Sequence, residues 1–276
     1  MTGPKPVGRW VIAWVCGVVV FVLVTLILGA EAAPDGFQMA TADGAWARLA
    51  GLLLAAVAAG AVVPLAAGHD VPGLTAAAMG VGLVIVAQTG RSMMSASLAE
   101  PPDYWLYAVA ETAAVVIALL LAYATSSAMI EKVVGVERRE VWRRQVRVSD
   151  RRRRVPWEGI FLAMGAALLV TLGLGYALNG GQRGEGVAAV CMGATALAAA
   201  WLMHRAAPVR ETLWFAISAP LWTALLPLVG WVIVEATGDE ALPLAVAMSS
   251  LGTSPFAFCG AAVAGAMIGF WASYRG

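Results

Sequence analysis

Charged residues are scarce in this sequence. Only 13% of its 276 residues are Asp, Glu, Lys or Arg, about half of the ~25% that soluble domains carry. By contrast, 61% are hydrophobic and the mean hydropathy is +0.80. A soluble protein needs more charge than this to cover its surface, so a soluble globular domain is excluded. The net charge of +1 also implies no polyelectrolyte partner such as nucleic acid.

Reactive and metal-binding motifs are lacking as well. The three cysteines, Cys16, Cys191 and Cys259, each lie within an apolar run and show no CxxC spacing, which argues against a disulfide framework or a zinc site. No Walker A, HExxH or GxSxG motif occurs. The two histidines, His69 and His204, adjoin charged residues, so a bis-histidine haem is not expected. We expect no cofactor and no metal ion, and the lack of a catalytic motif favours a non-enzymatic protein over an enzyme.

Long apolar runs are abundant. Runs of about 18 or more residues can cross a ~30 Å hydrocarbon core at 1.5 Å per residue. We therefore predict an all-α, polytopic transmembrane helical bundle with about eight spans. The predicted spans are residues 10–30, 46–67, 74–89, 104–130, 160–178, 187–203, 213–234 and one crossing within 242–271.

Two of these runs allow alternative interpretations. The first resembles a signal peptide with a cleavage site near Ala30–Ala32, but it exceeds the ~7–15 residues of an ordinary signal h-region, so we favour a retained signal anchor. The last contains the stretch Ser249–Pro255. Because proline leaves backbone groups unpaired, this stretch predicts either a kinked helix or an outer half-helix before the crossing.

Basic residues are concentrated between the fourth and fifth predicted spans. This central basic segment, residues 131–159, holds ten of the eighteen Lys and Arg residues. With eight spans, only Arg48, Arg91 and Arg183 fall on the opposite side from the segment and the two termini. The positive-inside rule then places the segment and both termini in the cytoplasm. We expect an inner (plasma) membrane protein of bacterial type.

The central basic segment is a candidate binding surface in addition to its role in orientation. Each basic side chain near an anionic lipid surface contributes about 1 kcal/mol, so lipid headgroups are one expected partner. A membrane or cytoplasmic protein is another, whereas no nucleic-acid-binding fold is present. The arginines concerned are Arg143, Arg144, Arg147, Arg151, Arg152, Arg153 and Arg154.

The same segment divides the chain into an N-terminal half (1–130) and a C-terminal half (160–276) with four predicted spans each. Short similar sequences recur in both halves, although chance is a rival explanation because Ala, Val, Leu and Gly dominate throughout. Since each half has an even number of spans, a duplication would give parallel repeats. The recurring positions are Thr25 with Thr171, His69 with His204, and Ala108–Ala110 with Ala245–Ala247.

Glu111 is the leading candidate for a functional side chain. It lies about 10 Å along the fourth predicted span from Tyr104, where a carboxylate is costly unless it is paired or faces a cavity. Together with Arg48 and Glu235 it could form a proton- or cation-linked site open to the outside. The alternative is a structural ion pair or hydrogen bond between the second and fourth spans.

The broken stretch before the last span offers a second candidate. Thr253 and Ser254 precede Pro255, and a discontinuous helix of this kind can line a substrate site or can be a packed kink. The leading functional hypothesis is a permease or the membrane subunit of a transport complex. The alternative is a non-enzymatic scaffold or assembly subunit of a larger membrane complex, with an intramembrane enzyme acting on lipid as a third.

The predicted topology can be tested with single cysteines placed on either side in a variant lacking Cys16, Cys191 and Cys259. In intact cells without an outer membrane, a membrane-impermeant maleimide should label Thr41→Cys but not Gln145→Cys. Gln145→Cys should react only in inside-out vesicles, because the positive-inside rule places it in the cytoplasm. The reverse labelling pattern would reject the orientation.

Overall fold

The structure is a computed structural model, and it describes eight stretches of the chain. Within them all regular structure is α-helical, which confirms the all-α prediction. The central basic segment, His69, Thr253 and Ser254 lie outside the described residues, and predictions about them remain predictions. The described residues are 6–29, 45–68, 73–87, 101–133, 157–179, 186–206, 212–237 and 255–274.

Each described stretch holds one helix, and each helix corresponds to one predicted span. Four of them, α1, α2, α5 and α11, are long and apolar enough to cross a membrane. The prediction of eight crossings is not confirmed by length alone, since α3 has 14 residues where a straight span needs about 20. The helices are α1 (Pro6–Gly29), α2 (Ala45–Ala67), α3 (Leu74–Ala87), α5 (Pro101–Val133), α7 (Trp157–Asn179), α8 (Gly186–Ala206), α9 (Thr212–Thr237) and α11 (Pro255–Tyr274).

Backbone chemistry explains where several helices begin and end. Gly68 follows α2 with φ +69°, and its N–H donates to the Pro64 carbonyl oxygen at 2.9 Å. Glycine adopts this left-handed conformation without the steric cost of a Cβ, which makes it a common helix terminator. Pro255 is the first residue of α11, a position where the missing N–H costs nothing. The stretch before Pro255 lies outside the described residues, so the predicted kink or outer half-helix remains a prediction.

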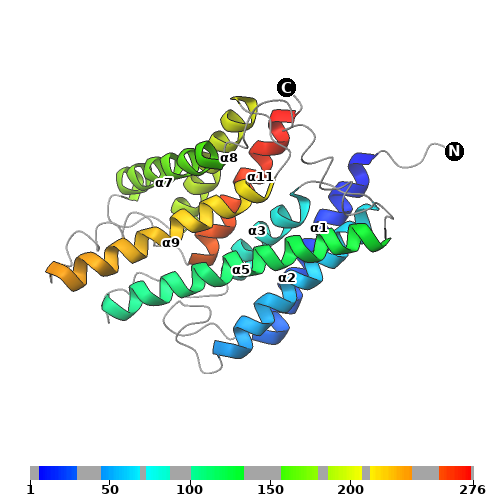
Figure 1. Cartoon of the computed structure of the whole chain (residues 1–276), viewed down its shortest axis with the longest axis horizontal. Coiled ribbons are helices and arrows are strands. Elements are labelled where there is room, and N and C mark those ends of the chain that lie inside the picture. The colour runs from blue at the N-terminus through cyan, green and yellow to red at the C-terminus, as the bar shows by residue number, and fades with distance from the viewer. Residues whose placement is uncertain are drawn as a thin grey trace.

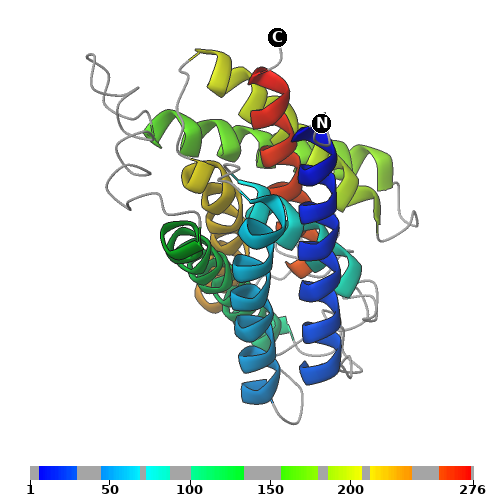
Figure 2. The ribbon, with the colours of Figure 1, turned by 90° about the vertical axis from the view of Figure 1, so that its right-hand side faces the viewer.

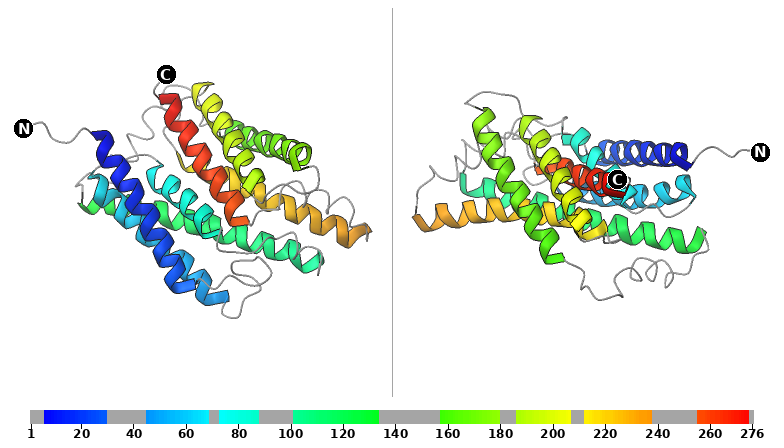
Figure 3. Two further views of the ribbon diagram at one scale, coloured as in Figure 1. Left: turned by 180° about the vertical axis from the view of Figure 1, so that it is seen from behind. Right: turned by 90° about the horizontal axis from the view of Figure 1, so that it is seen from above.

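The N-terminal and C-terminal helices form two groups joined through α3, α5, α9 and α11 (Figure 1). On one side α1 packs against α2 and α3, and on the other side α7 packs against α8 and α9. Across the middle, α11 contacts α3 and α5, and α5 contacts α9. Figure 3 shows α11 between α3 and α8. α11 is therefore a central helix that contacts both groups.

Specific contacts give the directions of neighbouring helices. Gly17 of α1 lies against Val63 near the end of α2, while Gly51 lies against Leu28, so α1 and α2 are antiparallel. In contrast, Gly193 and Leu197 of α8 meet α11 at successively later positions, so α8 and α11 run in the same direction. Figure 2 shows the start of α1 and the end of α11 at the same end of the bundle.

Glycines bring α11 into backbone contact with two neighbours. A Cβ placed on Gly265 would overlap the backbone of Gly193, and one on Gly269 would overlap the backbone of Leu197. On another face, a Cβ on Gly80 would lie 2.8 Å from the Gly260 carbonyl oxygen. Such close approach strengthens van der Waals packing where lipid removes the hydrophobic drive between helices.

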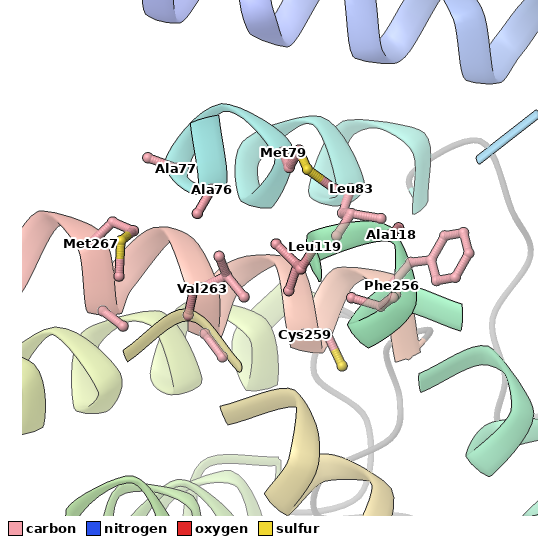
Figure 4. Close-up of a cluster of buried hydrophobic side chains, with 14 of the residues drawn as sticks. Ala76, Ala77, Met79, Leu83, Ala118, Leu119, Phe256, Cys259, Val263 and Met267 are labelled. Carbon is pink, nitrogen blue, oxygen red and sulfur yellow. The ribbon is translucent and has the colours of Figure 1, made fainter. Parts of the chain in front are cut away.

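A large apolar cluster fills the space where α3, α5 and α11 meet. Leu83, Leu119 and Phe256 converge there and are at most 1% exposed, as Figure 4 shows. The cluster continues along α11 through Val263 and Met267. The side of α11 that faces α3 is therefore apolar.

The glycine contact between α8 and α11 predicts a position-dependent effect on stability. Gly265→Leu should destabilise the protein by about 1–3 kcal/mol, because the added side chain must displace the α8 backbone. Gly8→Leu is the matched control, since nothing lies within 4 Å of a Cβ at Gly8. The measurement is reversible unfolding in mixed micelles. Equal stabilities of the two variants would contradict the close approach.

Candidate functional site

Glu111 is buried within the bundle. It lies on α5 with 1% of its surface exposed, and the adjacent Thr112 is equally buried. The helices packed against α5 are α2, α3, α9 and α11. Burial alone does not distinguish the two hypotheses for Glu111, a functional site and a structural pairing, and both remain predictions.

Cys259 connects Glu111 and Thr112 to two other helices. The Cys259 side chain, on α11, shares hydrogen bonds with the hydroxyls of Thr112 on α5 and Thr223 on α9, and the Glu111 carboxyl group is close enough to act on it electrostatically. In Figure 4 the Cys259 sulfur lies on the side of α11 away from α3. We call Glu111, Thr112, Thr223 and Cys259 the polar junction.

The polar junction joins three helices in otherwise apolar surroundings. Thr223 is 2% exposed and Cys259 is completely buried, so neither can rely on solvent for hydrogen bonds. Buried polar groups are stable when they satisfy one another, and interhelical hydrogen bonds of this type hold membrane helices together. A carboxylate in the same place also needs a compensating positive charge or a proton.

Arg48 lies at the same level of the bundle as Glu111. A Cβ on Gly60 of α2 would lie 2.7 Å from the Ala122 carbonyl oxygen and 3.0 Å from Thr125 on α5, and Figures 1 and 3 show the two helices running in the same direction. Arg48 precedes Gly60 by twelve residues on α2. Twelve residues before the contact at Ala122 and Thr125, α5 reaches the region of Glu111. Arg48 is half-buried. Their pairing remains a prediction.

The other predicted site residues are not brought to Glu111 by the described structure. Glu235 is exposed near the end of α9, about 18 Å along the helix from Thr223. Thr253 and Ser254 lie outside the described residues, but they directly precede α11, in which Cys259 is the fifth residue. The seven arginines of the central basic segment also lie outside the described residues.

A second set of polar contacts lies nearer the other end of α5. The Tyr123 hydroxyl donates to the Thr212 hydroxyl on α9 at 2.9 Å, and the Thr75 hydroxyl of α3 donates to Ser126 at 3.4 Å. Sequence reasoning missed these residues together with Thr112, Thr223 and Cys259. The only signal was the position of Thr112 beside Glu111, because the others are isolated polar residues in separate apolar runs.

α9 is also attached to α7 by an aromatic contact next to the polar junction. The Trp222 indole N–H donates to the Phe161 carbonyl oxygen at 2.6 Å, and the two rings stack with centroids 4.7 Å apart. A Cβ on Gly165 would lie 2.5 Å from the Trp222 ring. Successive residues of α9 thus contact different helices, Trp222 on the α7 side and Thr223 on the α5 and α11 side.

His204 is buried although the charged residue Arg205 follows it in the sequence. It is 4% exposed, its Nδ1 shares a hydrogen bond with Ser273, and its ring lies 4.5 Å from the Phe270 ring. The expectation that this histidine lacks apolar surroundings is therefore wrong. Its contacts join the end of α8 to the end of α11.

The described residues contain no group of three or more His, Cys, Asp or Glu side chains that could hold a metal ion. No protein-family model, curated protein sequence or solved structure matches this chain. The argument for function therefore rests on the polar junction itself.

The Tyr123–Thr212 contact predicts a measurable coupling between α5 and α9. In a double-mutant cycle of Tyr123→Phe and Thr212→Val, the interaction free energy should be about 0.6 kcal/mol, as for other interhelical hydrogen bonds in membrane proteins. Thr212→Ser is the control, because it keeps the acceptor oxygen and should retain the coupling. Additive effects of the first two substitutions on unfolding in micelles would contradict the contact.

Proposed function

We propose that this chain is a multi-pass inner-membrane permease, or the membrane subunit of a transport complex, whose solute route passes the polar junction. The observation that carries the proposal is the Glu111 carboxyl group, buried beside Thr112, Thr223 and Cys259 where α5, α9 and α11 meet. Ionisable residues inside membrane spans are costly, and they are typical of solute and ion pathways.

The depth of the polar junction favours transport. Thr223 lies eleven residues from the start of α9, which is about 17 Å along the helix. If α9 begins at one membrane surface and the span of α5 begins near Tyr104 at the other, the polar junction lies inside the ~30 Å core, about 17 Å from the first surface and about 10 Å from the second. Substrate and coupling-ion sites of secondary transporters lie at this depth, whereas an ion pair serving only stability has no need of it.

Helix direction supports eight crossings. If every helix crosses the membrane, α1 and α2 should be antiparallel, and α8 and α11 should run in the same direction. The contacts of both pairs agree with this expectation. The starts of α3 and α9 also lie together, since a Cβ on Gly73 would be 3.3 Å from Thr212. The short α3 is buried along most of its length, so it would cross within protein and not within lipid.

The pattern of helix neighbours supports a parallel duplication. A duplication would make α1 equivalent to α7, α2 to α8, α3 to α9, and α5 to α11. Each observed contact can then be compared with its counterpart. The α1–α2 contact corresponds to α7–α8, α2–α5 to α8–α11, α1–α3 to α7–α9, and α3–α5 to α9–α11. The α3–α11 contact corresponds to α5–α9. Apart from the small α2–α3 contact, every observed pair has an observed counterpart. This agreement is what a parallel duplication predicts.

The central basic segment fits the same proposal. It would hold the cytoplasmic ends of the two halves at the inner leaflet through anionic lipid headgroups or dock a partner of the transport complex. A scaffold or assembly subunit is the alternative function, and it would use the central basic segment in the same way. What separates the two is the role of the polar junction, which would bind solute in a permease and would only hold helices together in a scaffold.

A ligand screen on the purified full-length chain tests the proposal. In a panel of amino acids, sugars and inorganic ions, a transported solute at about 100 times its Kd should stabilise the protein by about 2.7 kcal/mol. Glu111→Gln should lose this stabilisation. Glu131→Gln, an exposed carboxylate on the same helix, should keep it. Melting is followed by intrinsic fluorescence.

The opposite result would favour the scaffold. It would consist of a stoichiometric partner protein that purifies with the chain under mild conditions, while no solute in the panel changes the melting temperature of the isolated chain. In that case Glu111→Gln would leave partner binding unchanged, and the transport proposal would be abandoned.

A further inference from the structure

We infer that the end of α8 binds the phosphate group of an anionic phospholipid through the Arg205 guanidinium, which the Trp201 ring holds in place. The inference rests on the proposal that α8 crosses the membrane, but it does not require a solute route. Three observations carry it: the contact between the two side chains, the exposed apolar stripe that they border, and the charge of their surroundings.

Arg205 and Trp201 form a cation–π pair. The guanidinium carbon of Arg205 lies 4.6 Å from the centroid of the Trp201 ring. The two residues are four apart on α8, so they share one face of the helix. Arg205 is exposed, whereas Trp201 is half-buried. The ring therefore restricts the guanidinium to one orientation, and the planar fork of N–H donors matches the oxygens of a phosphate group.

An exposed apolar stripe runs along α8 to this pair. Val190 is 72% exposed and Leu202 is 58% exposed. From Val190 to Arg205 the stripe covers about 22 Å along the helix, more than half of a ~30 Å hydrocarbon core. An acyl chain can therefore lie along the stripe while the headgroup of the same lipid reaches Arg205. The exposed members are Val190, Ala194, Ala198 and Leu202, and the buried residues between them include Met192, Ala196, Ala200 and His204.

The position of the pair in the bundle agrees with a headgroup site. His204, which precedes Arg205, hydrogen-bonds to Ser273 near the end of α11, and Figure 2 shows this end of α11 at the same end of the bundle as the start of α1. Tryptophan and arginine at the end of a span are typical of the membrane interface. Arg9 of α1 is also exposed at this end, so it faces the same membrane surface.

The charges around Arg205 favour an anionic ligand. The helices packed against α8 are α7 and α11, and Glu158 of α7 is the one acidic residue on these three helices within their described ranges. Helix carbonyl groups carry a partial negative charge at the C-terminal end, so a phosphate would bind the Arg205 side chain and not the backbone. A single exposed positive charge selects an anionic headgroup over a zwitterionic one.

A fluorescent label on the stripe reports which lipid lies beside Arg205. The full-length chain, with Cys16, Cys191 and Cys259 replaced by alanine, carries a coumarin maleimide on Ala198→Cys and is reconstituted in phosphatidylcholine liposomes. Small fractions of phosphatidylglycerol or phosphatidylcholine with a nitroxide on the acyl chain are then added. The ratio of quenching by the two nitroxide lipids gives the preference for the anionic lipid at this place, apart from any lipid held elsewhere on the chain.

We expect a preference for phosphatidylglycerol of at least about fivefold, the factor that one basic side chain contributes near an anionic lipid surface. Arg205→Gln should abolish the preference. Trp201→Leu, which keeps the charge but removes the ring, should lower it to about twofold. Arg9→Gln is the matched control and should retain it, as should Glu158→Gln, which removes the neighbouring acidic group. Inorganic phosphate at constant ionic strength should not displace the lipid.

Three outcomes would overturn the inference. One is an equal preference in Arg205→Gln and Arg9→Gln. Another is a full preference in Trp201→Leu, which would reduce the site to a general surface charge. The third is displacement by inorganic phosphate, which would make a soluble anion the ligand. Quenching by nitroxide phosphatidylcholine in every variant would show that α8 still contacts lipid, so that only the headgroup site fails. A label that neither lipid quenches would instead reject the crossing by α8.

Discussion

The arrangement of the bundle depends on how closely α11 approaches its neighbours. Gly265 and Gly269 place its backbone against α8, and Gly260 places it against α3, so one helix joins the two halves without large side chains between them. In a membrane, where lipid is as apolar as the helix surfaces, this close packing provides much of the attraction. The remaining surface of α11 carries the apolar cluster on one side and Cys259 of the polar junction on the other.

Two contacts near the middle of the bundle differ in their chemistry. Between α3 and α11 the contact is made by Gly80, Leu83 and Phe256 and is apolar. Between α5 and α9 a hydrogen bond joins Tyr123 to Thr212, and Thr112 of α5 and Thr223 of α9 both act on Cys259 of α11. The first contact is therefore stabilised by close apolar packing, whereas the second also depends on polar groups that satisfy one another.

Helix positions could be predicted from the sequence, because long apolar runs that end at charged residues, glycine or proline leave few alternatives. Glu111 could be identified because a carboxylate is rare within such a run. Thr112, Thr223 and Cys259 could not be grouped, since only helix packing brings them together. The match of Ala108–Ala110 with Ala245–Ala247 implied an offset of 137 residues between α5 and α11. That offset stays a prediction, because small apolar residues repeat too often in the sequence to define a register.

Trp222 and Thr223 have a mechanical consequence. Adjacent residues on a helix point about 100° apart, and here one is hydrogen-bonded and stacked against Phe161 of α7 while the other belongs to the polar junction. A rotation of α9 about its own axis would therefore break one of these contacts, so the attachment to α7 fixes which face of α9 is presented to the polar junction.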